Sequence, residues 1–130
     1  RDLHRVDRRA ASDVYKRQGH TQWSGTGGQS ETVQGAQMSP GGKSIIAMHS
    51  TYTTTDADGK KELHSKIVPF LHEGAVVTTS RNDTDYVVTE YGIAWLRGLN
   101  VRRRAEALIN IAHPDFREEL RRQAEINGIW

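Results

Sequence analysis

The sequence predicts an α/β fold in which an open sheet is followed by C-terminal amphipathic helices. Apolar, β-rich runs occupy the middle of the chain, and apolar residues at helical spacing occupy its end. Strands that precede packed helices are typical of an α/β layer. The length of 130 residues suits about one domain with a moderate core.

The basic excess of the chain lies at its start. The formal net charge is +2, and residues 1–18 carry the surplus of Lys and Arg while the remainder is close to neutral. This segment has no amphipathic face, and its DVYKRQ stretch resembles a translated adapter sequence. We predict that residues 1–18 are a non-native or disordered segment. Because the basic excess is not on a folded face, we expect no nucleic-acid binding.

The next part of the chain predicts a glycine loop, a short helix and two β regions. Residues 25–28 are glycine-rich, and a helix is predicted near residues 29–38. The apolar run at residues 45–48 fits a buried strand. The stretch TYTTTDADGKKE then predicts an exposed hairpin with Asp58-Gly59 as its turn.

Three further strands are predicted before the helices. HSKIVPFL and GAVVTTSR are β-rich runs over residues 64–71 and 74–81, with His72, Glu73 and Gly74 between their apolar parts. A turn at Asn82-Asp83 leads into the last strand, YVVTEYG.

Two helices are predicted at the end of the chain. Asn100 is a candidate N-cap for a helix with apolar residues at Val101, Ala105, Leu108, Ile109 and Ala112. Pro114 begins the second helix, in which Asp115 and the following Glu residues precede Arg residues, as the helix dipole favours. Asn127-Gly128 ends it.

Glu90 is the main candidate site residue because an apolar strand ends on its carboxylate. A side chain at the carboxyl end of a strand in an open α/β sheet faces the crevice where ligands bind. Gly92 lets the chain turn at once. The alternative is a glutamate bonded to nearby backbone at a helix start.

Several other kinds of site are excluded by spacing or composition. Gly42-Lys43-Ser44 is not a phosphate-binding loop, because Gln37 stands where the pattern needs glycine. The glycines at residues 25–28 do not make a dinucleotide fingerprint, because Ser30 takes the place of its third glycine. Cysteine is absent, which excludes thiol redox chemistry and suits a reducing, cytoplasmic location.

Histidine spacing and hydropathy complete these exclusions. The residues His20, His49, His64, His72 and His113 lie on different predicted elements, so we expect no metal site. His113, before Pro114, is interpreted as a helix-boundary residue. No apolar run is long enough to span a bilayer, so we expect no membrane association.

Six segments taken in order resemble one known family. They are GTGGQ, GGKSIIA, HSKIVPFL, AVVTTSRND, YVVTEYGIAWLRG and ALINIAHPDFREEL. Over residues 25–130 the chain resembles the C-terminal domain of the acetyl-CoA hydrolase/transferase family. The hairpin TYTTTDADGKKELHSKIVP is most similar to the branch that transfers CoA among butyrate, 4-hydroxybutyrate and acetate.

The resemblance implies a fold, a reaction and partners. The sheet would be of the CoA-transferase, NagB/RpiA-like type, with residues 19–130 forming a truncated C-terminal domain. The reaction would be a ping-pong exchange through a glutamyl-CoA thioester. No residue here matches the nucleophilic Glu, so the chain alone is expected to be inactive. The implied partners are an acyl-CoA, a short-chain carboxylate, the missing N-terminal domain and further copies in a homo-oligomer, with CoA as substrate and no cofactor.

The resemblance also implies roles for individual residues. Glu90 would be an auxiliary, pocket-lining carboxylate, and Gly27, Gly28 and Gln29 would form a glycine loop that contacts CoA. Lys60 would lie near the nucleotide phosphates of CoA, with Lys61 as the alternative.

Each of these roles has a plainer alternative. Residues 30–32 depart from the family's usual apolar-Asp-Phe, and a flexible turn is the other interpretation of the loop. A solvated hairpin charge is the other interpretation of Lys60. The alternative function is a noncatalytic acyl-CoA or nucleotide-binding module.

Overall fold

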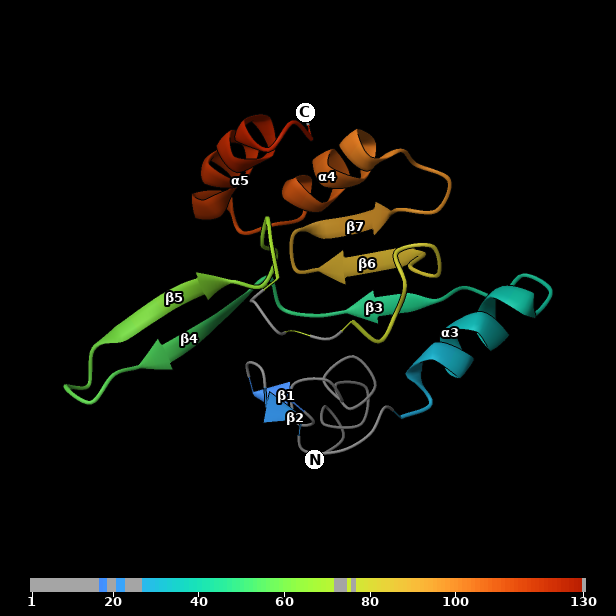
Figure 1. Cartoon of the computed structure of the whole chain (residues 1–130), viewed down its shortest axis with the longest axis horizontal. Helices are drawn as coiled ribbons and strands as arrows, with labels where there is room; N and C mark the ends of the chain where they lie inside the picture. The colour runs from blue at the N-terminus through green and yellow to red at the C-terminus, as the bar shows by residue number, and fades with distance from the viewer. Residues whose placement is uncertain (1–16, 19–20, 23–26, 72–74, 76, 130) are drawn as a thin grey trace.

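The computed structural model describes residues 17–18, 21–22, 27–71, 75 and 77–129. Most of the predicted N-terminal segment, Gly25 and Thr26 of the glycine loop, and His20 and His72 lie outside the described residues. Within the described part, the fold is a mixed α/β arrangement of small open sheets and three helices (Figure 1).

The central sheet has three strands in the order β3-β6-β7. These are β3 (Ile45–Ala47), β6 (Tyr86–Thr89) and β7 (Gly92–Trp95). β3 pairs with β6 in parallel, and β6 pairs with β7 in an antiparallel hairpin. Two shorter sheets accompany it: β1 (Arg17–Gln18) with β2 (Thr21–Gln22), and β4 (Thr51–Thr55) with β5 (Lys61–Ser65).

One face of the central sheet contributes to the core. The register aligns Ile46, Val87 and Ala94 in a row, and this row packs with residues of the two C-terminal helices. The next row holds Ile45 and Trp95, both of which are largely exposed. The predicted buried strand at residues 45–48 is therefore shorter and less buried than expected, because the described residues leave its second face largely uncovered.

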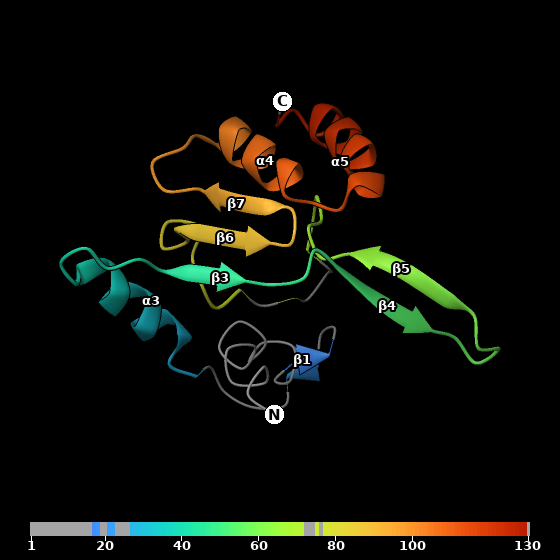
Figure 2. The same cartoon turned by 180° about the vertical axis from the view of Figure 1, so that it is seen from behind.

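The C-terminal helices begin where the sequence predicts, but α4 ends at Asn110, so the buried Ala112 follows the helix, and Val101 is exposed and not part of the buried core. α4 (Val101–Asn110) begins after Asn100, whose side-chain oxygen accepts a hydrogen bond from the Arg103 N–H at 2.9 Å. α5 (Pro114–Ile126) begins after His113, whose Nδ1 accepts from the Asp115 N–H, which confirms that His113 is a helix-boundary residue. In the two opposite views α4 lies beside β7, and α5 lies beside α4 (Figures 1 and 2). The buried core comprises Ile67, Val87, Ala94, Leu96, Ile109, Ile111, Ala112, Leu120 and Ala124.

The first described helix, α3, spans Gln29–Met38 as the sequence predicts, and it explains the glycines that follow it. A Cβ built on Gly42 would lie 1.9 Å from the Ala36 carbonyl oxygen. Glycine is therefore needed here for close backbone packing.

Two of the predicted strands are wrong in their described residues. β5 ends at Ser65, and residues 66–71 are not in a strand; Ile67 turns into the core, and Pro69 has no N–H for a ladder. Described residues between 75 and 81 also form no strand. β-Branched composition was a poor guide because these residues find no pairing strand within the described chain.

Candidate functional site

Glu90 lies in a tight turn between two antiparallel strands, not at the start of a helix. Thr89 pairs with Gly92, so Glu90 and Tyr91 form the two-residue connection between β6 and β7. Gly92 has φ +146°, a conformation that favours glycine. The sequence predicted the strand that ends here but missed β7, because the glycine was interpreted as the end of the β region.

Ser50 holds both oxygens of the Glu90 carboxylate. The Ser50 N–H donates to Oε2 at 2.9 Å, and the Ser50 hydroxyl donates to Oε1 at 2.6 Å. Ser50 is completely buried, whereas Glu90 is exposed. The carboxylate is thus fixed from one side and open to solvent on the other.

These bonds lower the pKa of Glu90. Desolvation acts to raise the pKa of Glu90, but hydrogen bonds from the Ser50 hydroxyl and from the Glu90 and Ser50 backbone outweigh it. The nearby His49 adds a smaller favourable interaction, and the pKa lies below the ordinary value. At neutral pH this group is therefore an anion that accepts hydrogen bonds and does not supply a proton.

The residues on either side of Glu90 attach the turn to the helices. The buried Thr89 hydroxyl donates to the Ile111 carbonyl at 2.6 Å and accepts from the Tyr91 N–H at 3.1 Å. The Tyr91 ring makes an edge contact with His113, and the Arg117 guanidinium lies 5.5 Å from its centroid. Glu90 is consequently mounted on the packed part of the molecule.

The other predicted site residues lie elsewhere. Gly27, Gly28 and Gln29 are at the N-terminal end of α3. The Gln29 Oε1 atom is buried and accepts no hydrogen bond from the described residues. Lys60 lies in the turn of the β4–β5 hairpin, where its N–H donates to Asp56 Oδ1 at 2.8 Å and Gly59 has φ +79°.

The start of α3, the β4–β5 turn and the β6–β7 turn that carries Glu90 do not lie together in the structure. Figures 1 and 2 show α3 and the β4–β5 turn at opposite ends of the long axis. Glu90 is connected to the base of the hairpin through Ser50, the residue before β4. Ser50 was missed by the sequence analysis, because it stands 40 positions from Glu90 and no local pattern marks the pair.

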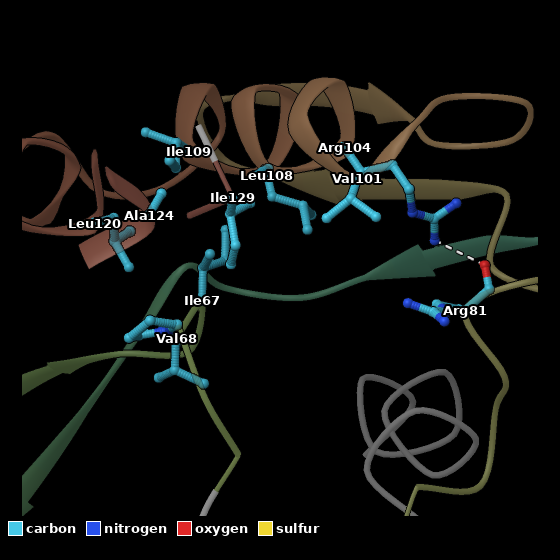
Figure 3. Close-up of a pocket in the computed structure, with 12 residues that line it drawn as sticks. Ile67, Val68, Arg81, Val101, Arg104, Leu108, Ile109, Leu120, Ala124 and Ile129 are labelled. Atoms are coloured by element: carbon cyan, nitrogen blue, oxygen red, sulfur yellow. Dashed lines mark hydrogen bonds between the residues drawn. The ribbon is translucent and has the colours of Figure 1, made fainter. Parts of the chain in front are cut away.

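A pocket that the sequence did not predict lies between the C-terminal helices and residues 67–69 (Figure 3). Its volume is about 230 Å³, and its lining is apolar apart from Arg81 and Arg104. Arg104 donates to the Leu96 and Arg81 carbonyls at 2.8 and 2.7 Å. Of the described residues that line the pocket, none belongs to the predicted site.

The described part of the chain shows neither a candidate metal site nor a candidate membrane-spanning helix. There, no group of three or more His, Asp or Glu side chains is placed to hold a metal ion. No helix among the described residues is both long enough and apolar enough to cross a membrane.

Comparisons with known proteins point to one family. Residues 6–124 match the model of the acetyl-CoA hydrolase/transferase C-terminal domain. The chain is 51% identical over 112 residues to butyryl-CoA:acetate CoA-transferase from Anaerostipes caccae, covering 86% of this chain and 24% of that protein. It is 57% identical over 102 residues to 4-hydroxybutyrate coenzyme A transferase from Clostridium kluyveri, covering 78% and 22%.

Two solved structures are also similar to this chain in both fold and sequence. RipA from Yersinia pestis matches with a TM-score of 0.66 at 44% identity, covering 80% of this chain and 22% of that one. A 4-hydroxybutyrate CoA-transferase from Porphyromonas gingivalis matches with a TM-score of 0.57 at 46% identity, covering 79% and 23%. The chain spans about a quarter of the length of these relatives. It belongs to the acetyl-CoA hydrolase/transferase C-terminal domain family.

Proposed function

We propose that this chain is the C-terminal part of a CoA-transferase that moves CoA between an acyl-CoA and a short-chain carboxylate such as acetate, butyrate or 4-hydroxybutyrate. The family match over residues 6–124 is the observation that carries this proposal. The names of the two curated relatives support the substrate class. The fold is of the NagB/RpiA-like type, with coenzyme A as substrate and no further cofactor.

The reaction proceeds by ping-pong exchange through a glutamyl-CoA thioester. Its nucleophilic Glu lies in the N-terminal domain, outside this chain. The two domains together enclose the site, and the complete protein forms a homo-oligomer. In this scheme the residues of the present chain bind and orient substrate, and the isolated chain is inactive.

Glu90 is the auxiliary carboxylate of the site. Its lowered pKa and its two bonds to Ser50 support an ionised group with a fixed orientation and an open side. Such a group accepts hydrogen bonds from substrate or orients the nucleophile in a position that needs no reorganisation during the reaction. The Gly27-Gly28-Gln29 segment contacts CoA through backbone N–H groups, and Lys60 meets the nucleotide phosphates.

A hybrid enzyme tests this proposal. Residues 27–130 replace the matching segment of the Anaerostipes caccae relative, and butyryl-CoA formation from acetyl-CoA and butyrate is followed. We expect the hybrid to be active and the isolated chain to show no turnover. Glu90→Gln keeps the shape but removes the charge, and should lower the hybrid's rate by roughly a hundredfold.

The matched control is Glu118→Gln, which changes an exposed carboxylate on α5. We expect it to leave the rate unchanged. Turnover by the isolated chain, or a folded hybrid without transferase activity, would overturn the proposed function. If the Glu90→Gln hybrid kept the wild-type rate, the proposed role of Glu90 in the site would be wrong.

A further inference from the structure

The β4–β5 hairpin, residues 51–65, projects from the molecule as an arm (Figures 1 and 2). Most of its side chains are exposed, and half-buried residues occur mainly near its base. A two-stranded hairpin has little stability of its own in water. The direction of the arm is therefore set by whatever fixes its base.

Ser50 makes the last backbone pairing at the base of the arm and is also buried in the packed part of the molecule. Thr51 pairs with Ser65, and one step further the Ser50 carbonyl accepts from the Lys66 N–H at 2.8 Å. Both strands of the arm are thus joined at a residue that has no exposed surface.

Glu90 connects Ser50 to the packed core. It accepts from the N–H and the hydroxyl of Ser50, while its neighbour Thr89 bonds to the Ile111 carbonyl. Hydrogen bonds to a charged group are stronger than those between neutral groups. A continuous set of hydrogen bonds and backbone therefore runs from the helix junction, through the β6–β7 turn, to the base of the arm.

Two neighbouring attachments define the pivot. Before Ser50, the Met48 N–H donates to the Val88 carbonyl at 3.0 Å and extends the β3–β6 pairing. After Lys66, the Ile67 side chain is buried in the core. The Ser50–Glu90 pair lies between these two points, where rotation of the chain would swing the whole arm.

We propose that Ser50 is a positioning residue, which through Glu90 fixes the direction of the arm and the orientation of the Glu90 carboxylate. Any effect of Ser50 on CoA binding rests on the proposed function, in which Glu90 and the arm residue Lys60 both contact the substrate. The effect of Ser50 on the direction of the arm does not, because it depends only on contacts within this chain.

The experiment measures the arm directly in the 130-residue chain. The sequence contains no cysteine, so Asp58→Cys at the arm turn and Glu125→Cys on α5 give a unique pair of spin-label sites. We expect a narrow distance distribution in the otherwise unchanged chain. Ser50→Ala and Glu90→Gln should each broaden it and speed amide exchange in the arm by about tenfold, through loss of a hydrogen bond to a charged group.

A titration of Glu90 by NMR provides a readout that a simple packing role would not move. Ser50→Ala should raise the pKa of Glu90 toward its ordinary value, because a bond to the ionised form is lost. The matched control is Thr54→Val, which removes a hydrogen bond to His64 within the arm itself. It should leave both the distance distribution and the Glu90 titration unchanged.

The outcomes separate clearly. Because Glu90 is exposed, Glu90→Gln retains the fold even if Ser50→Ala does not, and circular dichroism checks this. If Glu90→Gln leaves the distance distribution and the arm exchange as in the unchanged chain, the proposal is overturned. Failure of the hybrid transferase would not alter these measurements, so the two ideas fail independently.

Discussion

The β4–β5 and β6–β7 hairpins have the same antiparallel secondary structure but are supported differently. In β6–β7, Val87, Thr89 and Ala94 are buried, and the turn is bonded to the helix junction. In β4–β5, most side chains are exposed, and the turn is held by local hydrogen bonds to Asp56. Burial therefore stabilises β6–β7, whereas β4–β5 depends on its own strand pairing and on the contacts at its base. Substitutions should therefore have large effects in the first and small ones in the second.

The largest effect is expected from Ala94→Asp. Ala94 is 2% exposed, so a carboxylate there is buried without a partner and should cost at least about 3 kcal/mol of unfolding free energy. Ile93→Asp is the matched control, since Ile93 is 69% exposed on the opposite face. It should change stability by less than about 0.5 kcal/mol. Urea denaturation measures both, and equal losses would contradict the assignment of the two faces.

Thr89→Val tests the attachment of the turn to the helices. The substitution keeps the side-chain shape but leaves the Ile111 carbonyl without its buried hydroxyl donor. The expected loss is about 1–2 kcal/mol. Thr53→Val, on the exposed arm, is the control and should cost less than about 0.5 kcal/mol. Thermal denaturation of both variants measures the two losses. A neutral Thr89→Val would show that this bond contributes nothing.

Gly59→Ala tests whether the arm opens separately from the core. Gly59 has φ +79°, so a Cβ introduces strain of about 1 kcal/mol. Because the arm opens locally, amide exchange across residues 51–65 should accelerate about fivefold while the core amides keep their rates. Gly35→Ala, in the interior of α3 with open space around it, should instead stabilise its helix. Equal acceleration in the core would show that the two hairpins unfold together.

The smallest effect concerns an exposed ion pair. A bidentate hydrogen bond from Arg122, assisted by Gln123, lowers the pKa of Glu119 to about 2. A depressed pKa contributes stability above the unfolded value of 4.5, and this is lost as the pH falls toward 2. Arg122→Gln should raise the pKa of Glu119 in an NMR titration with almost no change in stability at neutral pH. An unchanged titration would contradict the pairing.

Local signals predicted much of the fold. Asn100 gave the start of α4, Pro114 and Asn127-Gly128 gave the bounds of α5, and Asp58-Gly59 gave the turn of the arm. Strand pairing was harder because it depends on partners. Residues 66–71 have β-rich composition but pair with no strand among the described residues, and β7 begins at Gly92, a residue type that weakens strands.

The candidate site divides in the same way. The sequence singles out Glu90 as a candidate because its place at a strand end is a local feature. Its partner Ser50 could not, because only tertiary structure brings together residues 40 positions apart. The hydrogen bonds from that partner help to lower the pKa of Glu90, so this shift was equally hidden from the sequence.

A double-mutant cycle in the hybrid enzyme tests the central claim, that Glu90 acts through a carboxylate held by Ser50. The rates of butyryl-CoA formation are measured for Ser50→Ala, Glu90→Gln and the double variant. If Ser50 acts only by holding Glu90, the double variant should be no slower than Glu90→Gln alone, because coupled residues are not additive. If the two rate losses instead multiply, the residues act independently, and the account of this site is wrong.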